Sequence, residues 1–599
     1  MATTAAPGTL APGGSFLLET PRAEDVFTPA ELTDDQRLIG QAAEEFVTKE
    51  VTPLIPEMEQ HKEGLMAGLL RKAGEIGLLG GGVPEEYGGS GLDRISSTVL
   101  SEKISSYGSF SVSVGAHSGI GTLPIVYFGT EEQKKKYLPK LSTGEWLAAY
   151  CLSEPQAGSD AQNSRTRAVL SPDGRNWILN GQKMWITNGG FADVYTVFAK
   201  VDGEKFSAFI VERGFPGFSV GAEEKKMGLR GSSTTPIFFE NCVVPRENLL
   251  HEIGRGHIVA FNILNVGRFT LGASCLGFCK SELASAARYS KERTAFGHSI
   301  SDFGLIKSKL AEIAIRTLAL ESMIYRTAGT IDQAMKATAT AGNKVTQTMK
   351  VLEEYAIECS IAKVFGSEVL DYTVDEAVQI YGGYGFHEDY PVARGYRDSR
   401  VNRIFEGTNE INRMLIIQML MKRAMAGTLP LMAAGAKLQE EILSGAPMEE
   451  SSDGQWAEES RIVQGAKKVF LLAAGAALQK YRDRLADQQE VIGALADMVL
   501  EIYPMESALL RAQKSVAARG KDSSGAITAA ARVLLQDGAA RVEANARTVL
   551  GASVEGDMLR TQLAVLRRMI KRESADTIGL RRIVADAVIN ANGYPFEGR

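Results

Sequence analysis

The sequence predicts a mainly α-helical protein with a central β domain, because the spacing of its apolar residues changes twice along the chain. Apolar residues recur at helical spacing over residues 28–147, short alternating runs fill residues 148–258, and helical spacing returns over residues 259–425. A chain of 599 residues, 44% of them apolar, is too long for one core and can bury several. We therefore expect a helical bundle, a β-barrel-like middle domain and a four-helix bundle, followed by a further helical bundle at the C-terminus.

The first helical unit begins with a capping signal. Thr33 is followed three residues later by Gln36, and the residues after them repeat as one apolar helix face. A second helix is expected around residues 64–76. Residues 1–27 contain neither a charged-then-apolar signal nor an Arg-rich amphipathic presequence. We therefore predict a disordered tail there, and a bacterial cytoplasmic protein with no evident targeting segment.

The middle unit consists of short runs with the two-residue period of strands. Gly, Asn and Pro separate these runs, which read RNWILNG, KMWITNG, DVYTVFAKV, FSAFIVER and PIFFENCVVP. Two pieces are the most informative, Tyr150–Asp160 with its small-residue turn and Met184–Gly189. Taken alone, Trp185 in such a strand is most simply a core residue.

The predicted linker of residues 426–455 separates the two later helical regions. It is rich in Gly, Pro, Ser and acidic residues. Residues 456–599 are predicted to form a C-terminal helical domain with four Ala- and Leu-rich helices, some of them amphipathic and basic. Such helices either pack on the rest of the protein or lie on a membrane surface.

Composition argues against several classes of protein. The net charge is −6 and the charges are well mixed, so the chain has no basic surface for nucleic acid. No window reaches the roughly 18 uninterrupted apolar residues of a membrane span. The five cysteines are far apart, which favours a reducing compartment over a disulfide framework. Cys275 and Cys279 lack a second ligand pair, and His251 and His257 are separated by glycines at the wrong spacing for zinc, so we predict no metal site.

The most informative stretch runs from Gln379 to Glu410. It opens with the glycine-rich QIYGGYG, where bare backbone can approach a large ligand, and continues through the charged RGYRDSR. Glu406 follows, between an apolar Ile-Phe pair and Gly407-Thr408. At a helix start, free N–H groups and aromatic neighbours suit a carboxylate that acts as a base. The simpler alternative is an acidic cap on a solvated turn.

This stretch resembles the C-terminal signature of the acyl-CoA dehydrogenase family, in which QIxGGxG, an RD pair and EGT follow one another. Further segments resemble family motifs in the same order: the flavin loops at Tyr150–Asp160 and Met184–Gly189, the acyl-CoA channel at Asn262–Leu271, and RxxFG at Arg293. The resemblance is close over about residues 30–425. Phe303-Gly304 and the long C-terminus point to the very-long-chain branch of the family.

The resemblance implies a role for each matched residue. Glu406 would be the catalytic base, Trp185 would pack on the flavin ring, and Ser153 and Thr187 would offer hydroxyls to the polar edge of that ring. The residues implied to bind FAD are Tyr150, Cys151, Leu152, Ser153, Gly158, Ser159, Trp185, Ile186, Thr187, Arg293, Phe296, Phe303, Gln379, Ile380, Tyr381, Gly382, Gly383, Thr408, Asn409 and Glu410. Those implied to bind acyl-CoA are Ser159, Asp160, Ala161, Asn265, Val266, Gly267, Arg268, Phe405 and Gly407.

Several of these positions carry a more specific expectation. Arg293 would reach the pyrophosphate, and Phe296 the adenine end, of a flavin bound by the neighbouring subunit. Asn265 and Arg268 are implied to contact either the pantetheine or the catalytic loop. Gly267 stands where some family members place their base, which leaves Glu406 without a rival.

Three glycines in the first helical unit have two interpretations. Gly115, Gly119 and Gly121 lie in SVGAHSGIGTLP. They either allow close helix contact or, by lacking side chains, leave space for a deep acyl tunnel.

The resemblance implies FAD-dependent α,β-dehydrogenation of long- or very-long-chain acyl-CoA to trans-2-enoyl-CoA in fatty-acid β-oxidation. A homodimer would pass the electrons to an electron-transfer flavoprotein, and burial should raise the pKa of Glu406. Two alternatives remain open on the same fold, an acyl-CoA oxidase and a non-catalytic assembly or scaffold protein. Peripheral membrane contact through the C-terminal helices would be an added property.

Overall fold

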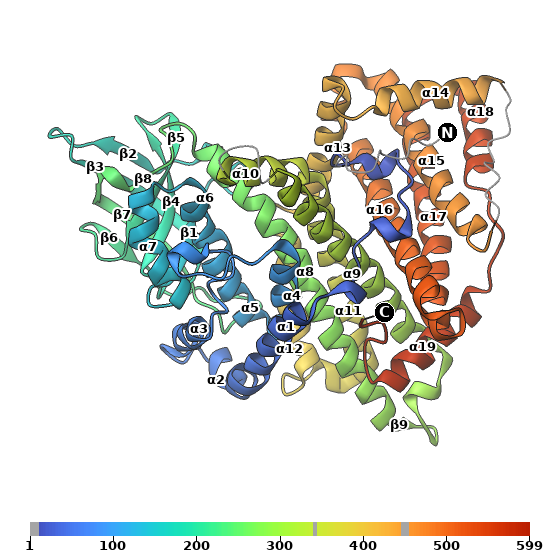
Figure 1. Cartoon of the computed structure of the whole chain (residues 1–599), viewed down its shortest axis with the longest axis horizontal. Coiled ribbons are helices and arrows are strands. Elements are labelled where there is room, and N and C mark those ends of the chain that lie inside the picture. Colours follow the sequence, from blue (N-terminus) through green and yellow to red (C-terminus); the bar gives the residue numbers. More distant parts are fainter. Residues whose placement is uncertain (1–10, 339–343, 445–453, 599) are drawn as a thin grey trace.

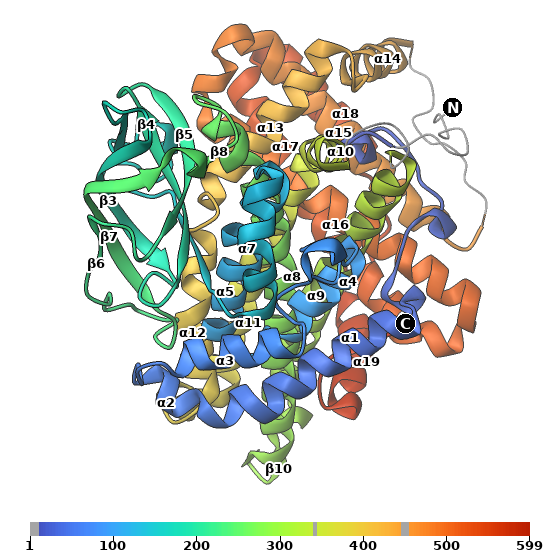
Figure 2. The ribbon, with the colours of Figure 1, turned by 60° about the vertical axis from the view of Figure 1, so that its left-hand side comes forward.

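The computed structural model describes residues 11–338, 344–444 and 454–598. Helices dominate, and one β domain lies at the edge of the molecule opposite the C-terminal helices (Figure 1). Long central helices run between these two parts, and Figure 2 shows the N-terminal helices lying across them. The predicted class, mainly α with a central β domain, is confirmed.

The N-terminal helices follow the predicted pattern. Helix α1 starts after Thr33, whose Oγ1 accepts a hydrogen bond from the Gln36 N–H at 3.2 Å, so the predicted cap is confirmed. A π-helical segment, Gly115–Gly121, continues α5. The helices of this unit are α1 Asp34–Phe46, α2 Ile55–Glu59, α3 Leu65–Glu75, α4 Arg94–Lys103, α5 Gly108–Val114, α6 Leu123–Phe128 and α7 Glu131–Thr143.

The middle domain is built on one eight-stranded sheet. Seven of its strands follow the order β6-β7-β3-β2-β4-β5-β8, and β1 pairs with β4 outside this order. Strands β4 and β5 are buried at nearly every position, the pattern of strands covered on both faces, whereas β3 alternates between buried and less buried residues over residues 176–180. The strands are β1 Ala148–Cys151, β2 Arg167–Leu170, β3 Asn176–Thr187, β4 Val194–Val201, β5 Lys205–Glu212, β6 Phe218–Val220, β7 Thr234–Pro245 and β8 Leu249–Leu250.

Six helices and a short hairpin form the described part of the next unit. Helices α8 and α11 pack along each other in the centre of the molecule. The elements are α8 Gly256–Glu292, β9 Thr294–Ala295, β10 His298–Ser299, α9 Gly304–Thr338, α10 Lys344–Glu354, α11 Ala356–Tyr381, α12 Pro391–Ser399 and α13 Asn409–Ala426. By length and composition α8 could cross a bilayer, but 61% of its most apolar window is buried inside the protein.

The C-terminal helices share a core with the central ones. The largest hydrophobic cluster joins residues of α8, α9 and α11 to residues of α15, α16 and α17. Over residues 456–590 we predicted four helices, whereas the structure has five, because the chain breaks between two short helices near the end. They are α15 Ala457–Tyr481, α16 Gln489–Arg519, α17 Gly525–Ser553, α18 Gly556–Met569 and α19 Thr577–Ala591.

The predicted disordered tail is wrong for residues 11–27, which are ordered as short 3₁₀ turns. The Gly14 N–H donates to Glu358 Oε1 at 2.7 Å, and Lys467 Nζ donates to the Glu19 carbonyl at 2.6 Å. The Phe16 ring lies 4.5 Å from that of Tyr503. These anchors belong to α11, α15 and α16, hundreds of residues away, so local composition gives no sign of them. The rest of the predicted tail, residues 1–10, lies outside the described residues.

The predicted linker of residues 426–455 is also partly structured. Helix α14, Leu431–Ser444, occupies its first half and buries Leu438. Its Ala, Leu and Glu content outweighs the single Gly435, which explains the helix. Residues 445–453 of the predicted linker lie outside the described residues.

Candidate active site

Glu406 lies in the short loop that enters α13. The side chain of Thr408 caps this helix by accepting from the Ile411 N–H at 3.3 Å. Glu406 itself has a φ of 58°, a left-handed conformation that costs a non-glycine residue about 1–3 kcal/mol. The surrounding structure must therefore hold this loop in place.

Two polar side chains hold the backbone of the loop. Arg268 Nε donates to the Glu406 carbonyl at 3.2 Å, and Arg268 Nη1 donates to Asn265 Oδ1 at 3.0 Å. Asn412 Nδ2 donates to the Gly407 carbonyl at 2.8 Å. Of the two roles left open for Asn265 and Arg268, the structure supports the catalytic loop.

The absence of a side chain at Gly267 leaves the space that the Glu406 carboxylate occupies. A Cβ atom on Gly267 would lie 2.7 Å from Glu406 Oε2 and 2.9 Å from Cδ, closer than real Cβ atoms approach. The carboxylate thus lies directly on α8, in space that any side chain at Gly267 would fill. A base on α8 at this position and a base at Glu406 therefore exclude each other sterically.

The surroundings of Glu406 change its acidity in the direction we predicted. Its Oε2 is buried and has no hydrogen-bond partner among the described residues. Burial raises the pKa of Glu406 to about 7, against the opposing attraction of Arg268 and Lys363. A carboxyl with this pKa is ready to accept a proton near neutral pH.

Glu406 opens into an apolar cavity between α5, its π-helical continuation and α8. Of the residues predicted to bind substrate or flavin, Thr187, Val266, Gly267, Phe405 and Glu406 line this cavity. Its other walls combine small and larger side chains. The small ones are Ser105, Gly108, Ser111, Gly115, Ala116, Gly119, Ser274 and Cys275, and the larger ones are Val112, Ile120, Leu229, Thr270, Leu271, Phe278, Leu370, Asp398 and Asn402.

The three glycines of the first unit divide between the two interpretations. Gly115 and Gly119 line the cavity, and a Cβ atom on either would meet no atom within 4 Å. A Cβ on Gly121 would lie 2.7 Å from the Ala116 carbonyl oxygen and 2.8 Å from Ala148 Cβ. The first two therefore leave space for a tunnel, and the third allows close packing.

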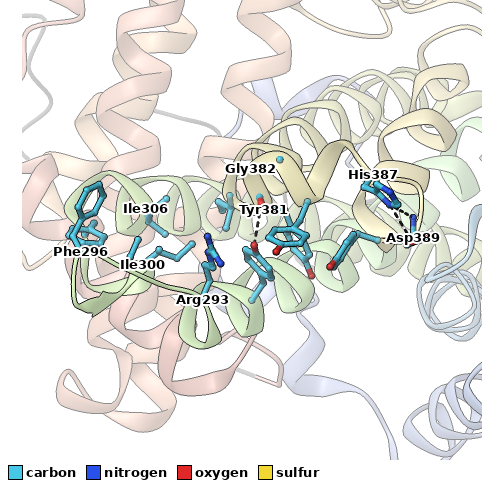
Figure 3. Close-up of a pocket in the computed structure, with 15 residues that line it drawn as sticks. Arg293, Phe296, Ile300, Ile306, Tyr381, Gly382, His387 and Asp389 are labelled. Carbon is cyan, nitrogen blue, oxygen red and sulfur yellow. Dashed lines mark hydrogen bonds and ion pairs between the residues drawn. The ribbon is translucent and has the colours of Figure 1, made fainter.

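A second cavity brings together seven of the residues predicted to bind FAD. Figure 3 shows Arg293, Phe296, Tyr381 and Gly382 along it, with Ile306 and His387. Phe296 is 92% exposed at a φ of 51°, and the Arg293 guanidinium lies 5.7 Å from the centre of the Tyr384 ring. The seven are Arg293, Phe296, Phe303, Ile380, Tyr381, Gly382 and Gly383.

The β domain presents Trp185 to the outside. This side chain is 61% exposed, and its residue has a φ of 56° in a stretch where the pairing of β3 with β7 shifts register. A bulge of this kind turns a side chain out of its normal alternation. The expectation from the strand pattern alone, a core tryptophan, is therefore wrong.

The loop after β1 is fixed by a buried ion pair that we did not predict. Lys183 Nζ lies 2.7 Å from Glu154 Oε1, and both side chains are almost fully buried. Glu154 also accepts from the Arg165 N–H at 2.6 Å and from Thr166 Oγ1 at 2.6 Å. Lys183 donates to the Leu152 carbonyl at 3.2 Å, so the pair sets the path of the backbone before Ser153. A lysine at an inward position of a strand is the only sign of it in the sequence.

Other predicted residues lie outside these two cavities. The side chains of Tyr150, Cys151, Leu152 and Ile186 are buried in the cores and line neither cavity. Asn409 is 3% exposed and bonded to α11, which corrects any role for its side chain as a ligand to the cofactor. The residues Ser153, Gly158, Ser159, Asp160, Ala161, Gln379, Gly407, Thr408 and Glu410 are partly or fully exposed and line neither cavity.

The residues present fit a large planar cofactor with a phosphate-containing tail. Bare backbone faces open space at Gly158, Gly382 and Gly383, where an added Cβ would meet no atom within 4 Å. The exposed Trp185 offers a flat apolar surface, and Arg293 offers a forked cation of the kind that binds phosphate.

The order of the units and the placing of a buried carboxylate beside an apolar cavity are those of a flavin-dependent dehydrogenase. Models of the acyl-CoA dehydrogenase N-terminal, middle and C-terminal domains match residues 33–145, 149–242 and 254–421, and a further C-terminal domain model matches residues 465–568. The chain belongs to the acyl-CoA dehydrogenase family.

Individual relatives cover nearly the whole chain. A probable acyl-CoA dehydrogenase of Bacillus subtilis is 48% identical, covering 97% of this chain and 98% of the relative. A mitochondrial very long-chain specific acyl-CoA dehydrogenase of Bos taurus is 35% identical, covering 91% and 85%. The crystal structure of an acyl-CoA dehydrogenase complexed with FAD from Bacillus anthracis has a TM-score of 0.94 and 47% identity, covering 97% and 99%.

Proposed function

We propose that the chain catalyses the FAD-dependent α,β-dehydrogenation of long- or very-long-chain acyl-CoA to trans-2-enoyl-CoA, as in fatty-acid β-oxidation. The observation that carries this proposal is the carboxylate of Glu406, buried without a partner for Oε2 and facing an apolar cavity. Family membership and the fit of Trp185 and Arg293 to a flavin support it.

Glu406 would take the α proton of the thioester. In water a carboxylate is far too weak a base for this proton, so its pKa has to be raised and the enolate has to be stabilised. Desolvation meets the first of these two requirements, since it raises the pKa of Glu406 to about 7. The cavity walls around Phe405 and Val266 exclude water from the acyl chain. When bound, FAD would supply the acceptor for the hydride that leaves the β carbon.

The preference for long chains is supported by the walls of the cavity. Gly115 and Gly119 leave open space where side chains would otherwise shorten the tunnel. The bovine very long-chain specific relative agrees with this proposal.

The electron acceptor distinguishes this proposal from an oxidase on the same fold. We propose an electron-transfer flavoprotein as the acceptor. A prolyl acyl carrier protein oxidase has a similar fold, with 29% identity and a TM-score of 0.58, so the oxidase is a genuine second candidate. Stoichiometric peroxide from acyl-CoA in air would favour the oxidase, and turnover that depends on added flavoprotein would favour the dehydrogenase.

A homodimer and contact with a membrane are further proposals. Phe296 and Phe386 are each about 90% exposed near the cavity that holds Arg293, as expected if a second subunit covers them. Met425, Met432 and Leu443 are exposed on α13 and α14 and could enter a lipid surface. Sedimentation of the full chain, alone and with anionic liposomes, tests both.

Replacing Glu406 tests the proposed function. Glu406→Gln keeps the shape of the side chain but removes the base, so we expect flavin and acyl-CoA to bind while the rate of flavin reduction falls by about 10³-fold or more. Anaerobic stopped-flow spectroscopy with a saturated acyl-CoA measures this rate. Glu353→Gln, on the exposed side of α10, is the matched control. A near-normal rate for Glu406→Gln would reject Glu406 as the base, whereas an absence of flavin reduction in the wild-type protein would favour the scaffold alternative.

A further inference from the structure

Lys363 is a fully buried lysine in α11 that the proposed reaction does not use. Its side chain is 0% exposed, and its Nζ donates to Asn409 Oδ1 at 2.6 Å. No Asp or Glu carboxylate among the described residues lies within 4.0 Å of this nitrogen. Burial of an ammonium group is costly, so a lysine kept here without a paired carboxylate calls for a specific role.

The partner of Lys363 follows directly after the catalytic loop. Asn409 is the first residue of α13, three positions beyond Glu406. Its Nδ2 donates to Ser367 Oγ at 3.0 Å and to Glu368 Oε1 at 3.1 Å. Both hydrogen-bonding ends of the Asn409 amide are thus bound to α11, which connects the start of α13 to that helix.

This connection complements the one from α8. Arg268 holds the Glu406 carbonyl from one side, and the Lys363–Asn409 pair holds the end of the loop from the other. Because Glu406 has a left-handed φ of 58°, it would relax if either support were removed. Geometry alone therefore gives Lys363 a part in presenting the carboxylate.

The charge of Lys363 also acts on the Glu406 carboxylate. Glu406 is influenced by Arg268 on α8, by Lys363 on α11 and by Tyr150 on β1. Lys363 is influenced in turn by Cys275 and Arg268 on α8, and by Glu406 and Glu410. Burial lowers the pKa of Lys363 to about 8, so the side chain is largely protonated at neutral pH and favours an ionised Glu406.

We propose that Lys363 is a positioning residue for proton abstraction, which fixes the Glu406 loop through Asn409 and favours the ionised form of the Glu406 carboxylate. This inference rests on the proposed role of Glu406 as the base. The two contributions, position and charge, predict different changes in the pH dependence of flavin reduction.

Two variants separate these contributions. Lys363→Met keeps most of the length of the side chain but removes both its charge and its donor. We expect its maximal rate of flavin reduction to fall about tenfold or more, and the midpoint of the acidic limb to move about one pH unit higher, because Glu406 loses a stabilising cation. Asn409→Ala removes the connection but keeps the charge, so we expect a similar loss of rate with a midpoint within about 0.3 units of the wild type.

The measurement is the rate of anaerobic flavin reduction by one saturated acyl-CoA between pH 5.5 and 9, on variants that retain bound flavin. Lys422→Met is the matched control, because it removes the same charge from an exposed position on α13. We expect its rate and midpoint to match the wild type.

The outcomes distinguish this inference from the proposed function. If Glu406→Gln is inactive but Lys363→Met reduces flavin with the wild-type rate and midpoint, the role of Lys363 is overturned and that of Glu406 stands. If Lys363→Met fails to fold, Asn409→Ala still decides, since a rate within about twofold of the wild type would reject the positioning role. A loss of rate in Asn409→Ala without a shift in midpoint supports it.

Discussion

At the scale of single residues, the site depends on two conformations that are costly by themselves. Glu406 and Trp185 both have a left-handed φ, of 58° and 56°. Glu406 is held by Arg268 and by the missing side chain of Gly267, and Trp185 is turned outward by a shift of strand register. Strain of this kind persists only where neighbouring contacts fix it, and here it places a carboxylate at a cavity and an aromatic ring on the surface.

The raised pKa of Glu406 predicts how activity and stability depend on pH. As the proposed base, Glu406 must be ionised for flavin reduction, so kcat/KM should rise with pH through a midpoint of about 7 in the free enzyme. The folded state holds this proton more tightly than the unfolded state, in which a glutamate titrates near 4.5. The folded protein therefore loses stability from this group as pH rises through 7.

The variant Glu406→Gln should not lose stability in this way as pH rises. We expect its thermal midpoint to exceed the wild-type value at pH 8 and to equal it at pH 4.5 or below, where both side chains are neutral. Differential scanning calorimetry of the flavin-bound proteins measures this. An equal difference at both pH values would mean that the carboxyl is not desolvated in the folded protein.

At the scale of elements, the π-helical continuation of α5 shapes the cavity beside Glu406. A π-helical turn widens a helix and is frequent at functional sites. His117, inside this segment, accepts at Nδ1 from the Ala148 N–H and donates from Nε2 to the Leu141 carbonyl, both at 2.9 Å. Burial lowers the pKa of His117 to about 4, so it stays neutral and can make both bonds. The segment is thereby attached to β1 and α7, and Gly115 and Gly119 face the cavity.

Filling this segment should shorten the preferred substrate. We expect Gly115→Leu to lower kcat/KM for the longest accepted acyl chain by about tenfold or more, because one methylene group in an apolar pocket is worth about 1–3 kcal/mol. The value for a chain about four carbons shorter should change by less than about threefold. Gly68→Leu, at an equally open helical position on α3, is the control. An unchanged chain-length profile would show that the acyl chain does not run past Gly115.

At the scale of the whole molecule, buried charges join the C-terminal helices to the central ones. Glu321 on α9 contacts Arg511 on α16 at 2.5 Å, and accepts from Lys280 on α8 and from the Tyr594 hydroxyl, each at 2.5 Å. Arg511 also donates to the Phe596 carbonyl at 2.9 Å. Together with the shared apolar core, this network makes the C-terminal domain part of one folded body.

Breaking this network should destabilise the whole protein. We expect Arg511→Met to cost about 3–5 kcal/mol, because it leaves Glu321 buried with less compensation. The exposed pair of Arg547 and Glu543 on α17 provides the control, and Arg547→Met should cost less than about 1 kcal/mol. Urea unfolding followed by circular dichroism and by flavin fluorescence should give one coincident transition that moves for Arg511→Met. Separate transitions for the two probes would contradict a single folded body.

Local pattern was enough to predict the class of fold and the cap at Thr33, and to propose Glu406 as the base. Each of these depends on neighbours within a few positions, such as Gln36 for the cap and the EGT motif for the base, and the acyl-CoA dehydrogenase motifs extended the same reasoning to the flavin loops. The spacing of these residues along the chain is therefore enough to predict such local features.

Only the tertiary structure decided which glycine lines the cavity, where the N-terminal residues lie and what holds Glu406. Gly115 and Gly121 are equivalent in the sequence, yet one faces open space and the other a carbonyl. The anchors of residues 11–27 and the bond from Lys363 to Asn409 join positions tens to hundreds of residues apart. Close contact between distant segments depends on how whole elements pack, and no local pattern of residues specifies that packing.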